Sequence, residues 1–501
     1  MEKKVIEYKR FDLAKGYLFF LSLFFLFVPM QYRMEKILRT LKKILFKGVS
    51  DFPAFFDRSV YLTISDIFIV ILLCFVLFYI KPRAKKFLIS GSLKFLLFYF
   101  ILILALQAFS PYKDFSFQYY KWIQLGISAS IVFIIASSES LFSQAKILKC
   151  LAISTVFASV IQSIAAVIQY FSQKPIGLKY LGELNFAAQG VTPSFIAPND
   201  GSLWIFDHIF SSGTFRILAR AYGTFSDPNI LAGYMVFAVM SSIYLFIKET
   251  GKKAKYLIAS AIFLQIFTVV ITYSRSGFFG VILGGGVFFS LLFLKLMRSR
   301  KSDFNINQRT LEIAKIKVVF AVVLSSLVLS TGLFYHQLWQ RGGYINYKNT
   351  SAENSDNERK IYQDMALSSI QQNPLKGVGF NSSQFDIKKK AEEKHLPHYI
   401  SHPVHNVFLL IASESGLLAL GCFVLFLIHA VFSMLRRGLN EESIFLISIF
   451  IPFLGIACCS HYFFSWTSGR LMFFILMGCI CLAGKSRETS KENVTLMPQR
   501  A

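Results

Sequence analysis

His405 is the residue of this chain whose type and position best suit proton transfer. It lies in Pro403-Val404-His405-Asn406, where a long polar stretch meets an apolar run. Pro403 suits the first turn of a helix, so His405 is expected near the positive, N-terminal end of that helix. The helix dipole and partial burial both disfavour a charged imidazole, so the sequence predicts a neutral ring that can accept a proton. Taken alone, a histidine that is merely hydrogen-bonded at the membrane interface is an equally good interpretation.

Three arginines have positions from which they could bind phosphate. Arg275 occupies the tight turn Ser274-Arg275-Ser276-Gly277 between two apolar runs, where a charge at membrane level is costly unless an anion meets it. Arg359 is expected in the first turn of a polar helix, and Arg220 precedes a segment that re-enters the membrane; for Arg359 a solvated surface charge is the ordinary alternative. Guanidinium groups bind phosphate through paired hydrogen bonds and keep their charge. With a neutral histidine, this set suits attack by a hydroxyl on a sugar pyrophosphate, because the arginines stabilise the leaving group.

Residues close to His405 in the sequence are expected to support this site. If the helix after His405 is unbroken, Ala412, Gly416 and Ala419 share its face, and such a stripe admits a neighbouring helix or a lipid chain. Glu414 falls on the opposite side, so it is not expected to orient the ring and needs another partner. The supporting candidates are His402, Asn406, Glu414 and Gly416.

The elements that must position these residues are membrane helices. Of the 501 residues 54% are hydrophobic and 16% are charged, whereas soluble proteins carry about 25% charged residues. Apolar runs of about 17–25 residues recur, which predicts an all-α polytopic membrane protein of about twelve spans. The predicted spans are 14–30, 60–80, 95–110, 123–138, 149–171, 229–248, 256–273, 277–296, 314–335, 405–434, 442–460 and 464–484.

The charged residues and cysteines exclude other classes. The net charge of +25 comes mostly from short basic clusters beside apolar runs, as membrane topology requires, so no nucleic-acid partner is expected. The seven cysteines lie in or beside apolar segments, so neither a disulfide framework nor a metal site is expected. No acidic cluster indicates a divalent cation, and no cofactor is expected.

Basic clusters also predict the orientation. With a cytoplasmic N-terminus, five of them fall on the cytoplasmic side: 81–86, 252–255, 298–301, 436–437 and the tail from 485. The basic segment 31–59 disagrees, and its helical spacing predicts a helix lying on anionic lipid. The expected regions are a membrane region of five spans (1–171), a long extracytoplasmic loop (172–228), four spans (229–335), a second long loop (336–404), three spans (405–484) and a cytoplasmic tail (485–501).

Two capping patterns predict helix starts. Asp227 is expected to cap a helix whose first residue is Pro228. In the second long loop, Ser355-Asp356-Asn357-Glu358 fits a capping box, and Asn373-Pro374 is expected to end that amphipathic helix. An ordered helix in this loop suits a lid or a site wall, whereas plain disorder is the alternative.

Four motifs follow one another over roughly 215–435, and their order is characteristic. They are Gly223-Thr224-Phe225-Ser226-Asp227-Pro228-Asn229; Ser274-Arg275-Ser276-Gly277; Arg359 followed by Asn373-Pro374-Leu375-Lys376-Gly377-Val378-Gly379; and His405-Asn406 through Glu414-Ser415-Gly416. Together they resemble the O-antigen ligase and O-antigen polymerase superfamily of bacterial envelope glycosyltransferases. Ala419 stands where the family pattern usually has a second glycine.

The resemblance implies a helical membrane fold of the C type of glycosyltransferases. It implies transfer of a glycan from undecaprenyl pyrophosphate to a hydroxyl acceptor, such as lipid A-core or a growing polysaccharide, at the periplasmic face of the bacterial inner membrane. No metal is implied, and direct displacement would invert the anomeric carbon. Carried over by position, His405 is the proposed base, and Arg275 and Arg359 bind pyrophosphate; Arg220 is added for its place in the sequence. Membrane lipids and other envelope polysaccharide assembly proteins are the further partners expected.

Two alternatives stay open. Ligase and polymerase are not distinguished, although the chain length and the large first outer loop slightly favour a polymerase-like enzyme or an atypical ligase. A transporter or flippase of the same lipid-linked glycans is the second, but it requires polar groups along a transmembrane path, and charged residues within the predicted spans are few.

Overall fold

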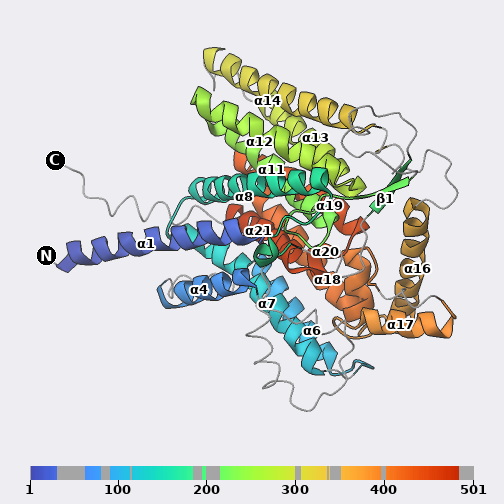
Figure 1. Ribbon diagram of the computed structural model, residues 1–501. Coiled ribbons are helices and arrows are strands. Elements are labelled where there is room, and N and C mark those ends of the chain that lie inside the picture. The colour runs from blue at the N-terminus through green and yellow to red at the C-terminus, as the bar shows by residue number, and fades with distance from the viewer. Residues whose placement is uncertain are drawn as a thin grey trace.

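The structure is a computed structural model in which helices form a bundle (Figure 1). It describes residues 2–30, 63–79, 91–112, 115–183, 194–198, 215–298, 306–335, 338, 351–396 and 402–484. The apolar helices are α1 (Glu2–Phe27), α4 (Ile64–Tyr79), α6 (Ser92–Gln107), α7 (Phe115–Ser137), α8 (Gln144–Ser172), α11 (Pro228–Lys248), α12 (Lys252–Ile271), α13 (Arg275–Arg298), α14 (Ile306–Leu333), α18 (Val407–Leu435), α19 (Glu441–Cys459) and α21 (Thr467–Ala483).

These helices support a multi-pass membrane fold. Each predicted span overlaps one of them, and within the described parts of the chain eight are long and apolar enough to cross a membrane. Four others are shorter apolar helices, covering 14–27, 64–78, 92–107 and 467–483. The predicted basic surface helix at 31–59 and the clusters at 81–86 and 485–501 lie outside the described residues.

Helix α11 forms the centre of the bundle. All of its most apolar stretch is buried, and it packs against α8, α12, α13 and α19. Small residues explain how closely α13 approaches, since a Cβ atom at Gly277 would overlap Ala232, and one at Gly280 would press on Val236. Glycine at such crossings lets two membrane helices pack backbone to backbone.

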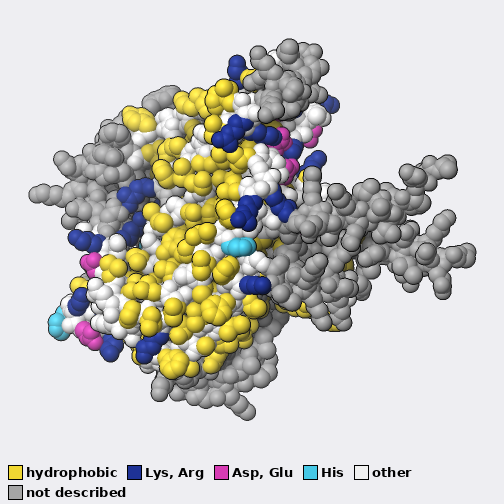
Figure 2. Space-filling view, turned by 180° about the vertical axis from the view of Figure 1, so that it is seen from behind, with side chains coloured by type: hydrophobic (Ala, Val, Ile, Leu, Met, Phe, Trp, Pro, Cys, Tyr) yellow, Lys and Arg dark blue, Asp and Glu magenta, His cyan; other side chains and the backbone are white. Residues whose placement is uncertain are grey.

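Apolar side chains also cover the outside of the bundle. Phe157 and Val328 are each 60% exposed, which suits contact with lipid rather than water. Figure 2 shows a broad apolar belt on one face, with lysine and arginine side chains gathered along its margins. The belt and its margins are those of a membrane-embedded protein.

Basic residues on the predicted cytoplasmic side lie at one end of the bundle. Lys248, at the end of α11, bonds Glu441 of α19 at 2.5 Å, and Lys295 of α13 bonds the same carboxylate at 3.4 Å. The clusters at 252–255, 298–301 and 436–437 adjoin these helix ends in the sequence. The opposite end carries the described parts of both long loops (Figure 1).

The first long loop contains a pair of strands. β1 (Ser194–Pro198) pairs antiparallel with β2 (Phe215–Ala219), with Ser194 opposite Ala219 and Pro198 opposite Phe215. After β2 the chain enters α11 as the sequence predicts: the Asp227 side chain accepts from the backbone N–H of Asn229 at 2.6 Å, and Pro228 is the first helical residue.

The second long loop has more structure than the sequence predicts. Helix α16 (Ser351–Gln372) begins four residues before Ser355, so the predicted capping box lies inside the helix and that prediction is wrong. Asn373-Pro374 ends the helix, as predicted. A further short helix, α17 (Ser383–Glu393), follows. The two helices lie side by side with the outer part of α18 (Figure 1).

Candidate functional site

Helix α18 is broken, which corrects the expectation of one continuous helix. Gly416 has φ 80° and ψ 170°, values that no residue inside an α-helix adopts, and the positive φ favours glycine. A Cβ atom there would overlap the carbonyl group of Leu375. Gly416 is therefore where a loop inserts, and the uninterrupted stripe of Ala412, Gly416 and Ala419 does not exist.

The loop that inserts is the motif 373–379. A helix break leaves backbone carbonyl and N–H groups without helical partners, which is costly in a buried or membrane setting. The loop forms hydrogen bonds with three of these backbone groups. The motif 373–379 and the motif that follows His405 therefore form one structural unit. These bonds run from Val378 N to Ser413 O (2.9 Å), from Gly379 N to Glu414 O (2.8 Å) and from Leu417 N to Pro374 O (2.8 Å).

Glu414 holds the next part of the same loop. Its buried carboxylate accepts from the N–H of Asn381 at 2.9 Å and from the hydroxyl and N–H of Ser383 at 2.7 and 3.3 Å. Ser383 begins α17, so the carboxylate meets the positive end of that helix. Glu414 thus positions the outer helices, and these hydrogen bonds do not involve His405.

Helix α6 and the chain after it hold the other side of the loop. The side chain of Gln107 accepts from the N–H of Phe380 at 2.8 Å, and the Ser110 hydroxyl donates to the carbonyl oxygen of Val378 at 2.8 Å. A Cβ atom at Gly379 would overlap Ser110. The loop is therefore wedged between α6 and α18.

His405 lies just outside α18. Asn406 is the N-cap: its side-chain oxygen accepts from the N–H groups of Phe408 and Leu409 at 2.9 and 3.0 Å. Pro403 consequently precedes the helix rather than occupying its first turn, which corrects that prediction. Asn406 supports the site by starting the helix directly after the histidine.

The imidazole of His405 lies between two other rings. The Tyr362 ring of α16 is 5.9 Å away with planes at 32°, and the His461 ring is 5.0 Å away with planes at 73°. Burial, followed by the positive charge of Arg359 and by His402, lowers the pKa of His405 to about 4. Its Nδ1 atom is buried and has no hydrogen-bond partner among the described residues. The ring is thus neutral at neutral pH, as the sequence predicts.

Arg359 and His402 are the other predicted residues that the structure brings to His405. Arg359 is half-buried on α16, and its Nε atom is buried without a hydrogen-bond partner in the described part of the chain. It is close enough for its charge to act on His405. His402 packs edge-on to Tyr362 at 6.4 Å. A fixed positive charge therefore adjoins a neutral histidine.

His461 is the member of this group that sequence reasoning missed. It lies between α19 and the short helix α20 (Tyr462–Ser465), it is only 9% exposed, and its Nδ1 atom is 2.5 Å from the Ser465 hydroxyl. Burial, followed by His405, His402 and Arg359, holds its pKa well below the usual range. The sequence does contain one indication of its role. His461 is a histidine in a turn between two predicted spans, on the same side of the membrane as His405.

Arg220 and Arg275 lie at the same end of the bundle as His405, but in a neighbouring part of that end. Arg220 is buried, and its guanidinium donates to the carbonyl oxygen of Thr272 at 2.6 Å and to the side chain of Asn229 at 2.9 Å. It therefore ties the turn before α13 to the start of α11. Arg275 is exposed at the first position of α13.

The first turns of α11 connect the two parts. The Tyr462 side chain, next to His461, leaves no room for a Cβ atom at Gly233, and Gly277 packs on Ala232. Gly277 is two residues from Arg275 and Tyr462 directly follows His461. The arginine turn and the histidine group thus flank the same helix start.

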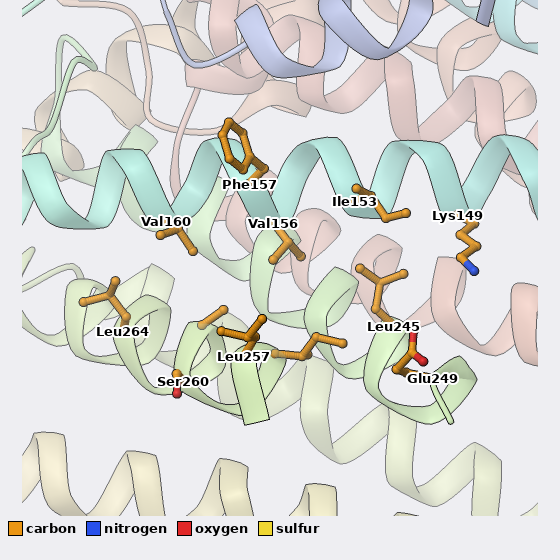
Figure 3. A pocket seen from close by; sticks show the side chains of 12 residues that line it. Lys149, Ile153, Val156, Phe157, Val160, Leu245, Glu249, Leu257, Ser260 and Leu264 are labelled. Carbon is orange, nitrogen blue, oxygen red and sulfur yellow. The ribbon is translucent and has the colours of Figure 1, made fainter. Parts of the chain in front are cut away.

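The cavity in Figure 3 is unrelated to this group. It has a volume of about 480 Å³ and lies between α8, α11 and α12, with apolar walls and with Lys149 and Glu249 at one end. Glu249 directly follows α11, so the cavity extends toward the end of the bundle opposite to His405. None of the residues named for the site lines it.

The central region of the chain matches a known protein family. Residues 260–424 match the family described as O-antigen ligase, and this range contains Arg275, Arg359, His405 and the break at Gly416. The resemblance to the O-antigen ligase and polymerase superfamily is thereby confirmed. No curated protein matches the chain. The chain is thus a multi-pass membrane protein similar to a family of glycosyltransferase-type enzymes.

Proposed function

We propose that this protein is a membrane glycosyltransferase of the O-antigen ligase or polymerase type. It transfers a glycan from undecaprenyl pyrophosphate to a hydroxyl of lipid A-core or of a growing polysaccharide. The observation that carries the proposal is the pairing of Arg359, whose Nε atom has no partner among the described residues, with the neutral imidazole of His405. The family match over 260–424 supports the reaction class.

The proposed reaction is a single displacement. His405 takes the proton of the acceptor hydroxyl as that oxygen bonds to the anomeric carbon, and the bond from this carbon to the pyrophosphate oxygen breaks. Lipid pyrophosphate leaves, and the guanidinium groups of Arg359 and Arg275 stabilise its growing negative charge. Attack opposite the leaving group inverts the anomeric carbon, and no metal is required for the charge. His405 then releases the proton to water, which its low pKa favours.

His402, Asn406, Glu414 and Gly416 take supporting roles in this proposal. Asn406 and Gly416 set the two ends of the short helical segment that follows His405, and Glu414 holds α17 against it. Arg220 positions the turn that carries Arg275. His402 lies beside Tyr362, whose ring also contacts His405.

The proposed placement puts the histidine end of the bundle in the periplasm and the protein in the bacterial inner membrane. The basic helix ends near Lys248 and Lys295 are then cytoplasmic, as the asymmetry of lysine and arginine predicts. Twelve spans, in regions 1–171, 229–335 and 405–484, are part of this proposal, as are the extracytoplasmic loops 172–228 and 336–404 and the cytoplasmic tail 485–501. Membrane lipids and other envelope polysaccharide assembly proteins are its proposed partners.

Reconstitution tests the function against transport. The purified protein is placed in proteoliposomes with an undecaprenyl-pyrophosphate-linked oligosaccharide and either lipid A-core or a second donor molecule as acceptor. We expect a new glycosidic bond and release of undecaprenyl pyrophosphate, detected by mass spectrometry. Movement of the donor across the bilayer without bond formation with either acceptor would instead establish a flippase.

A further inference from the structure

We propose that His461 is a positioning residue for His405, whose ring it holds in one orientation by ring packing. The inference rests on the proposed function, since it gives a role to the neighbour of the proposed base. His461 lies outside the residues matched to the family, 260–424.

Ring contacts orient the imidazole of His405. A catalytic histidine is usually held by a hydrogen bond from one ring nitrogen to a carboxylate or carbonyl group, while the other nitrogen reacts. The Nδ1 atom of His405 is buried and makes no such bond to any described residue. Ring contacts remain, with Tyr362 on one side at 5.9 Å and His461 on another at 5.0 Å. The edge-to-face arrangement with His461 is one that aromatic pairs prefer.

His461 is itself firmly held. It is 9% exposed, and its Nδ1 atom is 2.5 Å from the Ser465 hydroxyl, which also lies 3.0 Å from the His461 carbonyl oxygen. The next residue, Tyr462, is wedged against Gly233 of α11 and against Gly469 of α21. The ring therefore belongs to a packed turn that joins two helices to the bundle centre, which makes it a rigid support.

The surroundings of His461 hold its ring in the neutral form at neutral pH. The charged and titratable groups that act on it are His405, His402 and Arg359, and Glu358 acts on His402. A proton on His461 would therefore be buried beside a guanidinium and two other histidines. Its neutral ring suits packing, and a phenyl ring can reproduce that contact.

The experiment compares His461→Ala, His461→Phe and Ser465→Ala in the reconstituted transfer assay. We expect the alanine variant to lose about 10- to 100-fold in kcat with KM little changed, because the base is misplaced while donor binding persists. The phenylalanine variant should retain activity within about threefold of the original protein. Ser465→Ala, which loosens only the support, should fall between them.

The pH profile separates positioning from general structural damage. Removing the His461 ring admits water to His405, so the acid limb of kcat/KM should move from about pH 4 toward the ordinary histidine range in His461→Ala and stay in place in His461→Phe. If the alanine variant does not fold, His461→Leu takes its place, because leucine fills similar volume without a planar ring. Equal loss in the phenylalanine and alanine variants would overturn the proposal, as would unchanged kcat in the variant without a ring.

His405→Ala distinguishes this proposal from the function on which it rests. If that variant is inactive while His461→Ala is fully active, only the role of His461 fails. If His405→Ala transfers glycan normally, the proposed function of the site itself fails.

Discussion

A side chain at Gly416 would occupy the position of the Leu375 carbonyl group. This contact fixes the loop at the C-terminal end of α16 against the break in α18. Because α16 carries Arg359 and α18 directly follows His405, the contact also limits how the two groups move relative to one another. The glycine is thus a structural requirement for the site, although it touches neither group in the structure.

Gly416→Ala should destabilise the protein. The positive φ costs about 1–3 kcal/mol for a residue with a side chain, and the overlap with Leu375 adds to this. We expect a lower midpoint of thermal unfolding in detergent. Gly421→Ala is the matched control, because this glycine lies in the same helix with nothing within 4 Å of an added Cβ atom. Equal stability of the two variants would contradict the account of the break.

Glu414→Gln should loosen α17 without removing the chemistry. The amide offers one acceptor oxygen where the carboxylate accepts from Asn381 and from both groups of Ser383, and a buried donor left without its acceptor costs about 1–3 kcal/mol. Hydrogen exchange at 381–383 should become faster, and transfer should fall less than in Arg359→Ala. Glu393→Gln, on the exposed face of α17, should leave exchange unchanged. Unaltered protection in Glu414→Gln would refute the role of this carboxylate.

Arg359→Ala should reduce transfer by about 10²–10³-fold, the usual effect of removing a group that stabilises charge in the transition state. Arg359→Lys should restore only part of this, because an ammonium lacks the paired donors of guanidinium. Lys360→Ala removes an exposed charge from the next position and should have little effect. Similar activity in the two alanine variants would show that the position of the charge is unimportant.

The pH dependence of transfer should follow the lowered pKa of His405. The base is active when neutral, so log kcat/KM should stay level from pH 7 down to about 5 and decline around pH 4. An ordinary histidine would decline near pH 6.5. A decline centred near 6.5 would mean that His405 is not buried in the working enzyme.

The lowered pKa of His405 also makes the free energy of unfolding depend on pH. The unfolded chain takes up a proton near pH 6.5, whereas the folded protein resists until about pH 4. The free energy of unfolding should therefore decrease as pH falls through this interval and should not change above it on account of His405. Denaturation curves of the original protein and His405→Gln between pH 7 and 4 measure the difference, which should be smaller in the variant.

Sequence patterns were sufficient where local physics decides the structure. The apolar runs located the membrane helices, and Asp227 with Pro228 located the start of α11, because hydrophobicity and capping act within a few residues. The end of α16 at Asn373-Pro374 was predicted for the same reason. The family resemblance added the order of the motifs.

Long-range packing explains what the sequence did not predict. The run after His405 is continuously apolar, so periodicity indicated an unbroken helix, and only contact with the loop at Leu375 accounts for the break at Gly416. His461 has no distinctive neighbours in the sequence and becomes notable only when α18 and α19 bring two turns together. A capping pattern is only a local preference, and α16 begins at Ser351, four residues before the predicted one.

Single-turnover transfer by His405→Ala tests the role of His405 as the base most directly. The donor is saturating, and the rate of glycosidic bond formation is compared with that of His395→Asn, an exposed histidine with positive φ on the same side of the protein. We predict a loss of about 10²–10⁴-fold for His405→Ala, with normal folding and donor binding, and little change for the control. Bond formation at the original rate in His405→Ala would contradict the account.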